Sequence, residues 1–275
     1  MTRIALLQMT TGIHPDANAV TLVEAVADAA GGGAEMLFTP EMSGLLDRER
    51  ERAAPHVVPE GENPVLKAVR DAAKQKGIWV ALGSLAVERS DGRWANRSFL
   101  ITPDGMIAAR YDKIHMFDVA LATGETWRES AVYAPGEQVV TASTPIGELG
   151  LAVCYDVRFP ALFEELGRRA CDAIALPAAF TVPTGAAHWH VLQRARAIEA
   201  SAYVISAAQV GEHEDGRRTY GHSLVVDPWG EVLLDMGGEK PGLGFAEIDA
   251  KRIADVRGQL PSLVNKRKIP TLNSQ

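Results

Sequence analysis

The sequence predicts an α/β fold in which β-sheets are covered by helices, and three observations predict it. Apolar runs of strand length alternate with amphipathic stretches of helical length along the whole chain. Some neighbouring strands are joined by tight turns and are typical of β-hairpins. No linker, low-complexity segment or long charge block divides the 275 residues. We therefore expect one domain over residues 1–275.

The first half of the chain contains strands, two helices and one hairpin. The helix at 63–77 has residues typical of both helix ends, with Asn63 at the N-cap, Pro64 at the first position and Gly77 just past the end. The earlier helix, at 16–30, has apolar residues at helical spacing, namely Val20, Val23, Val26 and Ala27, and ends at a run of three glycines. The remaining segments are the strands "RIALLQM" (3–9), "EMLFTP" (35–40) and "IWVALGSLAV" (78–87), and the hairpin "RSFLITPDGMIAARYD" (97–112).

The second half repeats this alternation. Strands are expected at "LGLAV" (149–153), "DAIALP" (172–177) and "AYVISAAQV" (202–210), with helices at 160–170 and 186–200 between them. A hairpin, "HSLVVDPWGEVLLD" (222–235), turns at residues 227–230. The strand "GFAEID" (244–249) and a helix of about ten residues from Asp249 complete the pattern.

The composition excludes several classes of function. The net charge of −7 argues against nucleic acid as a partner, and no segment has the length of a membrane span. Cys154 and Cys171 form neither a CxxC motif nor a disulfide framework, which favours a reducing cytoplasm. The sequence contains no complete dinucleotide or phosphate loop, so we expect no cofactor. His188 and His190 are two apart on a helix and face differently, so we expect no metal site there.

Three reactive residues follow three apolar strands. Glu41, Lys113 and Cys154 each stand just past the carboxyl end of a strand, the edge at which open α/β sheets gather their ligands. Position alone leaves other interpretations open. Cys154 could be an inert core residue, Glu41 a carboxylate at a helix start, and Lys113 a solvated surface charge.

The chemistry of the three residues is complementary. A thiol is a strong nucleophile once its proton is removed, and a carboxylate can accept that proton and return it to a leaving amine. A lysine ammonium can stabilise the oxyanion of a tetrahedral intermediate. Pro160 is typical of a first helical position, so the turn after Cys154 is expected to present free backbone N–H groups.

These segments resemble the nitrilase superfamily, the carbon–nitrogen hydrolases with a Glu-Lys-Cys triad, almost from end to end. "FTPEMS" is similar to the glutamate segment, "RYDKIHMFD" to the lysine segment and "GLAVCYDVRFP" to the nucleophile segment. The resemblance implies catalytic roles for Glu41, Lys113 and Cys154. "WRES" resembles the position of a second, accessory glutamate, here Glu129. The backbone N–H of Tyr155 is the implied second oxyanion donor.

The resemblance also implies a fold and an assembly. The fold is a four-layer α-β-β-α sandwich. Protomers of the family usually associate through helices, so a homodimer or homotetramer is expected. A C-terminal tail from about residue 258 is expected to pack at a subunit interface.

Tyr155 and the segments "AFTVPTGAAHW" and "YGHSLVVDPWG" are similar to the Nit amidase branch of the family. That similarity implies an amidase that hydrolyses a non-peptide C–N amide bond of a small carboxylate-bearing substrate through a cysteine thioester. The expected substrate is deaminated glutathione, cleaved to 2-oxoglutarate and cysteinylglycine. The alternatives are an ω-amidase acting on α-ketoglutaramate, an N-carbamoyl amino acid amidohydrolase and a nitrilase.

Four residues are candidates for contacting the substrate. Arg158 could grip a carboxylate through two hydrogen bonds, or could form a salt bridge with Asp156 or Glu164. Phe180, Thr181 and Thr184 lie in the "AFTVPTG" segment. The two threonines could contact substrate or could cap a helix that begins near Ala186.

Overall fold

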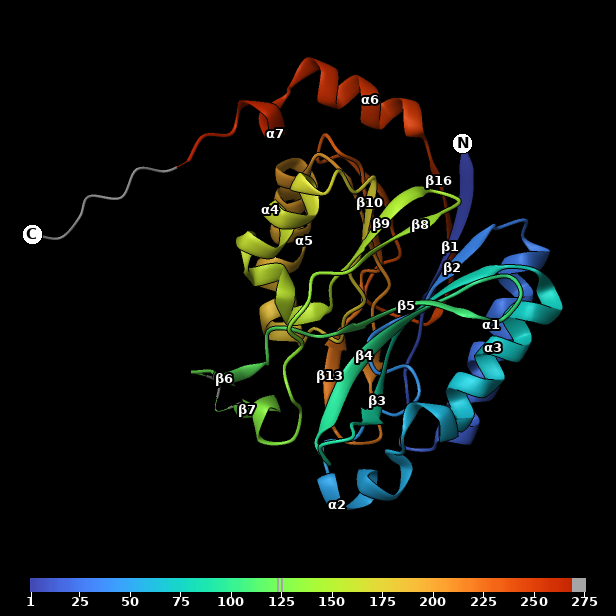
Figure 1. Cartoon of the computed structure of the whole chain (residues 1–275). Helices are drawn as coiled ribbons and strands as arrows, with labels where there is room; N and C mark the ends of the chain where they lie inside the picture. Colours follow the sequence, from blue (N-terminus) through green and yellow to red (C-terminus); the bar gives the residue numbers. More distant parts are fainter. Residues whose placement is uncertain (123, 125, 269–275) are drawn as a thin grey trace, which may run out of the picture.

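Two six-stranded β-sheets lie face to face at the centre of the molecule (Figure 1). The computed structural model describes residues 1–122, 124 and 126–268. Helices α1 (Pro15–Gly31) and α3 (Pro64–Lys76) cover the outer face of the first sheet, and α4 (Pro160–Arg168) and α5 (Val182–Ala200) cover the second. The four-layer α-β-β-α sandwich expected from the resemblance is therefore confirmed.

Both sheets have three parallel central strands with antiparallel strands beside them. In the first sheet, the parallel strands are β1 (Thr2–Gln8), β2 (Met36–Phe38) and β3 (Trp79–Glu88). In the second, they are β9 (Gly147–Leu151), β10 (Ala173–Ala175) and β11 (Tyr203–Ser206). Parallel neighbours need crossover connections, and helices provide them. The alternation predicted for the two halves is thus present as two similar sheets.

The outer strands complete each sheet. The first has the order β16-β1-β2-β3-β4-β5, with β16 (Gly242–Ile248), β4 (Trp94–Ile101) and β5 (Ile107–Asp112). The second has the order β15-β14-β11-β10-β9-β8, with β15 (Val232–Asp235), β14 (Leu224–Val226) and β8 (Thr141–Thr144). The shorter elements are β6 (Asp118–Ala120), β7 (Thr126–Arg128), β12 (Val210–Glu212), β13 (Arg218–Tyr220), α2 (Arg50–Ala53), and the 3-10 turns η1 (Ala54–His56), η2 (Glu60–Glu62), η3 (Glu129–Ala131) and η4 (Cys154–Arg158).

Strand β1 shows how the sequence creates the layers. Ile4 and Leu6 belong to the core between the sheets, whereas Ala5 and Leu7 belong to the core beneath α1 and α3. Successive side chains of a strand point to opposite faces, so a strand buried on both faces must be apolar throughout.

Every predicted strand and helix is present, and the buried face of α1 differs from the prediction. Helix α3 has the expected caps, with Asn63 accepting a hydrogen bond from the Leu66 N–H at 3.0 Å and Gly77 at φ 65°. In α1, Val20 follows the helical spacing of Val23 and Val26 but is 57% exposed. The buried face of α1 is instead built on Leu22, Ala25, Val26 and Ala29.

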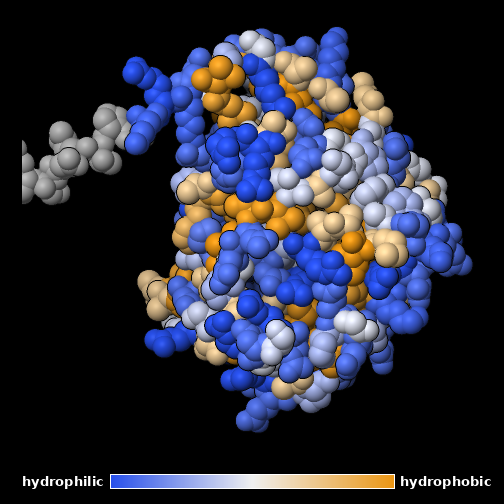
Figure 2. All heavy atoms as spheres, viewed as in Figure 1, coloured by the Kyte–Doolittle hydropathy of each residue, from blue (hydrophilic) through white to orange (hydrophobic). Residues whose placement is uncertain are grey.

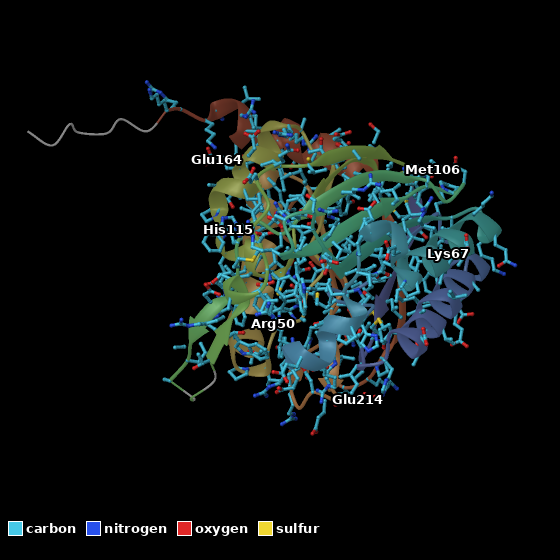
Figure 3. All side chains as sticks on the ribbon, turned by 60° about the horizontal axis from the view of Figure 1, so that its bottom comes forward. Arg50, Lys67, Met106, His115, Glu164 and Glu214 are labelled. Atoms are coloured by element: carbon cyan, nitrogen blue, oxygen red, sulfur yellow. The ribbon has the colours of Figure 1, made fainter. Side chains whose placement is uncertain are left out.

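The C-terminal segment crosses one end of the sandwich. Helix α6 (Ala250–Gln259) begins at the Asp249 N-cap, as predicted, and α7 (Ser262–Asn265) follows it. Lys266 pairs with Glu164 of α4, and Glu164 lies beside this segment in Figure 3. Residues 269–275 lie outside the described residues. The single domain and the packing of the tail at a subunit interface stay predictions. None of the helices in the described ranges combines the length and apolar character needed to span a bilayer.

Candidate active site

Glu41 is held in a turn that is bonded closely to strand β3. The Ser43 N–H donates to the Ser84 carbonyl at 3.0 Å, and the Met42 N–H donates to the Ser84 hydroxyl at 2.9 Å. Gly83 permits this approach, because a Cβ there would lie 2.0 Å from the Thr39 carbonyl oxygen. The backbone therefore sets the direction of the Glu41 carboxylate, which is 4% exposed.

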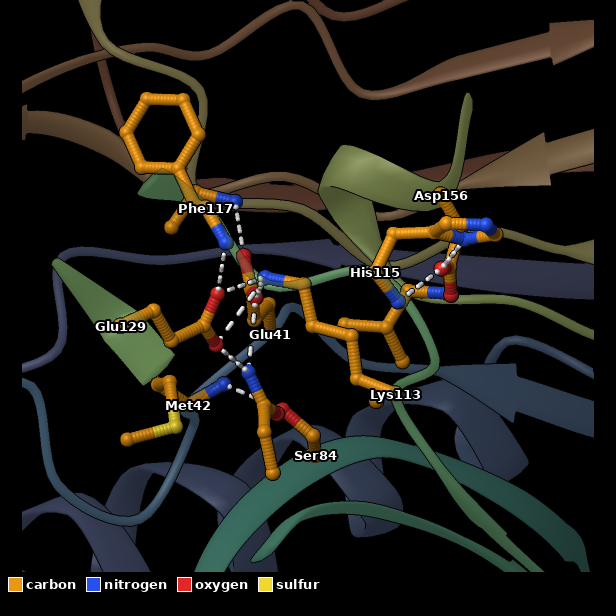
Figure 4. Close-up of polar contacts among 12 residues, drawn as sticks. Glu41, Met42, Ser84, Lys113, His115, Phe117, Glu129 and Asp156 are labelled. Atoms are coloured by element: carbon orange, nitrogen blue, oxygen red, sulfur yellow. Dashed lines mark hydrogen bonds and ion pairs between the residues drawn. The ribbon is translucent and has the colours of Figure 1, made fainter. Parts of the chain in front are cut away.

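Lys113 directly follows β5 and points into the same space. Its Nζ lies 3.0 Å from Glu41 Oε1 and 2.8 Å from Glu129 Oε2 (Figure 4). Lys113 is only 2% exposed, so its alternative interpretation as a solvated surface charge is wrong. Glu129 begins η3, and its Oε2 also accepts the Phe117 N–H at 2.7 Å.

Cys154 begins the short turn η4 with a φ of 49°, in the left-handed region that non-glycine residues rarely adopt. The turn is held by Asp156, which accepts hydrogen bonds from the Val153 N–H at 2.9 Å and the Tyr111 hydroxyl at 2.7 Å. Asp156 also bonds both the backbone and the ring of His115, as Figure 4 shows. The lysine segment and the nucleophile segment are thereby joined through one buried carboxylate.

The electrostatics of the cluster keep the lysine charged and the thiol protonated at rest. Burial would lower the pKa of Lys113, but Glu129 and Glu41 raise this pKa well above its usual range. Burial, followed by the charge and hydrogen bond of Glu41, raises the pKa of the Cys154 thiol, and Lys113 partly opposes that increase. The thiol therefore sits beside a carboxylate that can accept its proton.

The backbone supplies a free donor next to the thiol. Among the described residues, the Tyr155 N–H has no hydrogen-bond acceptor, as is usual for the first residues of a helical turn. This N–H lies one residue after the sulfur. An oxyanion formed at a carbonyl attacked by Cys154 would have both this donor and the Lys113 ammonium near it.

These groups line a pocket of about 600 Å³. All nine site residues predicted from the sequence line it: Glu41, Lys113, Glu129, Cys154, Tyr155, Arg158, Phe180, Thr181 and Thr184. Aromatic rings form much of the remaining wall, namely Trp94, Phe117, Trp127 and Tyr133. The structure therefore brings the predicted residues together, while their chemical roles stay predictions.

Two local interpretations of the sequence are corrected. Arg158 makes no salt bridge with Asp156 or Glu164, because Tyr111 and His115 occupy the first and Lys266 the second. Its guanidinium lies 5.2 Å from the centre of the Phe180 ring and 3.2 Å from His188 Nδ1.

The second correction concerns the start of α5. The helix begins at Val182 and not near Ala186, because Pro183 is tolerated in a first turn. Thr181 is the N-cap residue by position, but its side chain makes no capping hydrogen bond. The capping interpretation therefore does not explain the Thr181 hydroxyl.

Comparison with known proteins assigns the family. The carbon–nitrogen hydrolase family model matches residues 3–258. The chain belongs to this family. Carbon–nitrogen hydrolases are enzymes, and the family resemblance noted in the sequence is thus confirmed.

Relatives match this carbon–nitrogen hydrolase over nearly its whole length. A deaminated glutathione amidase of Yersinia enterocolitica is 38% identical, covering 98% of this chain and 94% of the relative. One of Synechocystis is 40% identical, covering 95% and 97%. Among solved structures, the C. elegans NitFhit protein has a TM-score of 0.89 at 34% identity. That alignment covers 97% of this chain and 65% of the NitFhit chain. Saccharomyces cerevisiae Nit3 has a TM-score of 0.85 at 26% identity, covering 95% and 94%.

Sequence reasoning missed Asn96 in this hydrolase. Its side-chain amide donates to Glu41 Oε1 at 2.9 Å and to Glu129 Oε1 at 3.1 Å. Its backbone carbonyl accepts a hydrogen bond from the backbone N–H of Lys113. Asn96 is 2% exposed. The signal in the sequence is weak, because Asn96 is followed in strand β4 by two further polar residues, Arg97 and Ser98.

Proposed function

We propose that this enzyme is an amidase that cleaves deaminated glutathione to 2-oxoglutarate and cysteinylglycine through a thioester on Cys154. The observation that carries the proposal is the cluster of Glu41, Lys113 and Cys154 in one pocket, with Glu129 bonded to the lysine. The names of the relatives supply the substrate. The cluster itself supplies the reaction class.

Acylation begins with a neutral thiol and an ionised Glu41. The Glu41 carboxylate takes the thiol proton while the sulfur attacks the amide carbonyl carbon. The Lys113 ammonium and the Tyr155 N–H stabilise the resulting oxyanion. Protonated Glu41 then gives its proton to the departing nitrogen. The C–N bond breaks, and the amine leaves behind a thioester.

Deacylation uses the same residues in reverse. A water molecule adds to the thioester carbonyl and loses a proton to Glu41. The intermediate expels the sulfur, which recovers a proton from Glu41, and the acid is released. Glu129 and Asn96 hold the Lys113 ammonium and the Glu41 carboxylate in position through both steps.

The charge and size of the pocket favour a large anionic substrate over a small one. Among the described lining residues, six are positively charged and three are negatively charged. The positive residues other than Lys113 are Arg48, Arg50, Arg128, Arg158 and Arg217. Deaminated glutathione carries two carboxylates, whereas α-ketoglutaramate carries one and is much smaller. Arg50 lies on α2 near the front of the view in Figure 3. The ω-amidase function is the second candidate.

The deciding experiment compares kcat/KM for deaminated glutathione and α-ketoglutaramate under identical conditions, with Cys154→Ala as the blank. A clear preference for deaminated glutathione supports the proposal. Preference for α-ketoglutaramate makes the enzyme an ω-amidase. Activity on neither, with N-carbamoyl amino acids or nitriles cleaved instead, overturns the substrate and leaves the thioester chemistry intact.

We also propose that the enzyme forms a homodimer or homotetramer in the cytoplasm. Apolar side chains are exposed on α5 and on the neighbouring β14–β15 hairpin, including Val191 (63%) and Trp229 (51%). Figure 2 shows hydrophobic atoms exposed near the middle of one face of the molecule. The two free cysteines fit a reducing compartment. Light scattering coupled to gel filtration measures the assembly, and a monomer at micromolar concentration would contradict it.

A further inference from the structure

Two histidines and an aspartate form a cluster that the reaction does not use. His190 Nε2 lies 3.0 Å from Asp235 Oδ2, and His222 Nδ1 lies 2.8 Å from Asp235 Oδ1. The three ligand atoms all lie within 4.8 Å of one another. None of the three residues lines the pocket.

The backbone segments that carry the three side chains are bonded to one another. The indole N–H of Trp189, a buried neighbour of His190, donates to the His222 carbonyl at 2.8 Å. The His222 N–H donates to the Gly237 carbonyl at 2.8 Å, and the Gly237 N–H donates to Asp235 Oδ1 at 2.9 Å. The cluster is therefore organised before any ligand arrives, which reduces the ordering cost of binding.

The histidine rings are also oriented from outside the cluster. Tyr220 stacks on His222 with the ring centres 4.3 Å apart, and it meets His190 edge to face. His222 has a φ of 53°, a conformation that fixes where its ring projects. Outer contacts of this kind hold ligand side chains in the orientation that a metal needs.

The donors suit zinc. Two imidazole nitrogens and one carboxylate oxygen are ligands that Zn²⁺ commonly accepts, with a water molecule as the fourth. The His190 and Asp235 side chains are 36% and 34% exposed, so an ion and its water can reach them. We propose that His190, His222 and Asp235 bind a divalent transition-metal ion of the Zn²⁺ type.

This site is separate from the catalytic cluster. On the same helix, His188 contacts Arg158 of the pocket, whereas His190 contacts Asp235. The two histidines face different partners, as their spacing predicts. The proposed ion is therefore structural or regulatory, and it does not depend on the proposed amidase function.

The test is titration calorimetry with ZnCl2 on the untagged, metal-free full chain. A Cys154→Ser background removes the pocket thiol as a competing ligand. We expect one ion per chain, and we expect His190→Ala to weaken binding at least about tenfold. Asp235→Asn and His222→Asn give further tests, and asparagine tolerates the positive φ at position 222. His56→Ala, which removes an exposed histidine outside the cluster, is the matched control.

A second readout identifies the donors. Co²⁺ in place of Zn²⁺ should give visible bands without the charge-transfer band of a sulfur ligand, and His190→Ala should remove them. Circular dichroism establishes that each variant is folded. Absence of Zn²⁺ binding, or binding unchanged by His190→Ala and Asp235→Asn, would show that the cluster is only a hydrogen-bonded chain and would overturn the proposal.

Discussion

Cys154 and Cys171 are both buried, with 7% and 0% of their surface exposed, and burial is the main cause of a raised pKa in both thiols. Burial raises the pKa of Cys171 to about 12. What separates them is their surroundings. Cys154 lies on a strained turn, lines the pocket and bonds to Glu41, whereas Cys171 is not among the described residues that line the pocket. A nucleophile is therefore marked by an adjacent base and access to substrate, and neither burial nor the pKa of the free thiol identifies it.

The largest expected effect tests this difference directly. Cys154→Ala removes the sulfur that forms the thioester, so turnover should fall to the background rate. Cys171→Ala should retain nearly full kcat, because Cys171 is not among the described residues that line the pocket. Steady-state hydrolysis of the preferred amide measures both. A Cys154→Ala protein with wild-type turnover would refute the mechanism.

The second effect separates the base from the nucleophile. Glu41→Gln should reduce kcat by about 10²- to 10⁴-fold, because proton transfer is lost. Glu41 raises the pKa of the Cys154 thiol, so its neutralisation should lower that pKa and shift thiol alkylation to lower pH. Turnover and thiol reactivity should thus change in opposite directions.

Iodoacetamide labelling against pH measures this shift. Cys171 is the internal reference, because it should react only after denaturation. The native protein should therefore take up one label and the denatured protein two. An alkylation profile that stays in place or moves to higher pH in Glu41→Gln would exclude Glu41 as the group that controls the thiol.

The sequence predicts which strand ends meet, and the fold explains why. Strand β5 is related to β3 by two antiparallel pairings, so it runs in the same direction as β2 and β3. Lys113 and Glu41 therefore emerge at one edge of the first sheet. Cys154 follows a parallel strand of the facing sheet, and the sandwich brings the two edges together. Strand direction therefore explains why these three residues meet, although position alone left other interpretations of each residue open.

The partners of these residues could not be predicted from the pattern. Asn96 bonds to Glu41, 55 positions away, and Asp156 bonds to Tyr111 and His115, 45 and 41 positions away. Such pairings depend on register and on the packing of the two sheets. The β3–β4 register shifts between Leu82 and Leu85, beside the turn that holds Glu41. The exposure of Val20 could not be predicted either. Apolar residues at helical spacing can be assigned to more than one face of α1, and only tertiary packing decides which face is buried.

A smaller effect concerns the wall of the pocket beyond Cys154. Arg158→Lys replaces a planar guanidinium, which can donate two hydrogen bonds to one carboxylate, with a single ammonium group. The KM for a keto-acid amide should therefore rise about tenfold while kcat changes little. A matched amide without the carboxylate is the control, and its KM should not change. Equal KM values for the anionic substrate in both proteins would remove Arg158 from carboxylate recognition.

The smallest effect returns to Cys171. The Cys171 sulfur packs close to Gly150, because a Cβ added at Gly150 would lie 3.1 Å from Cys171 Sγ and 2.8 Å from Leu166 Cδ2. Cys171→Ala removes a single buried atom, and we expect a loss of about 1 kcal/mol in the free energy of unfolding, below the cost of truncating a leucine. Urea denaturation measures it. Because activity should be preserved, the pair Cys154→Ala and Cys171→Ala assigns catalysis to one buried sulfur and packing to the other. A Cys171→Ala enzyme that is fully stable but inactive would reverse that assignment.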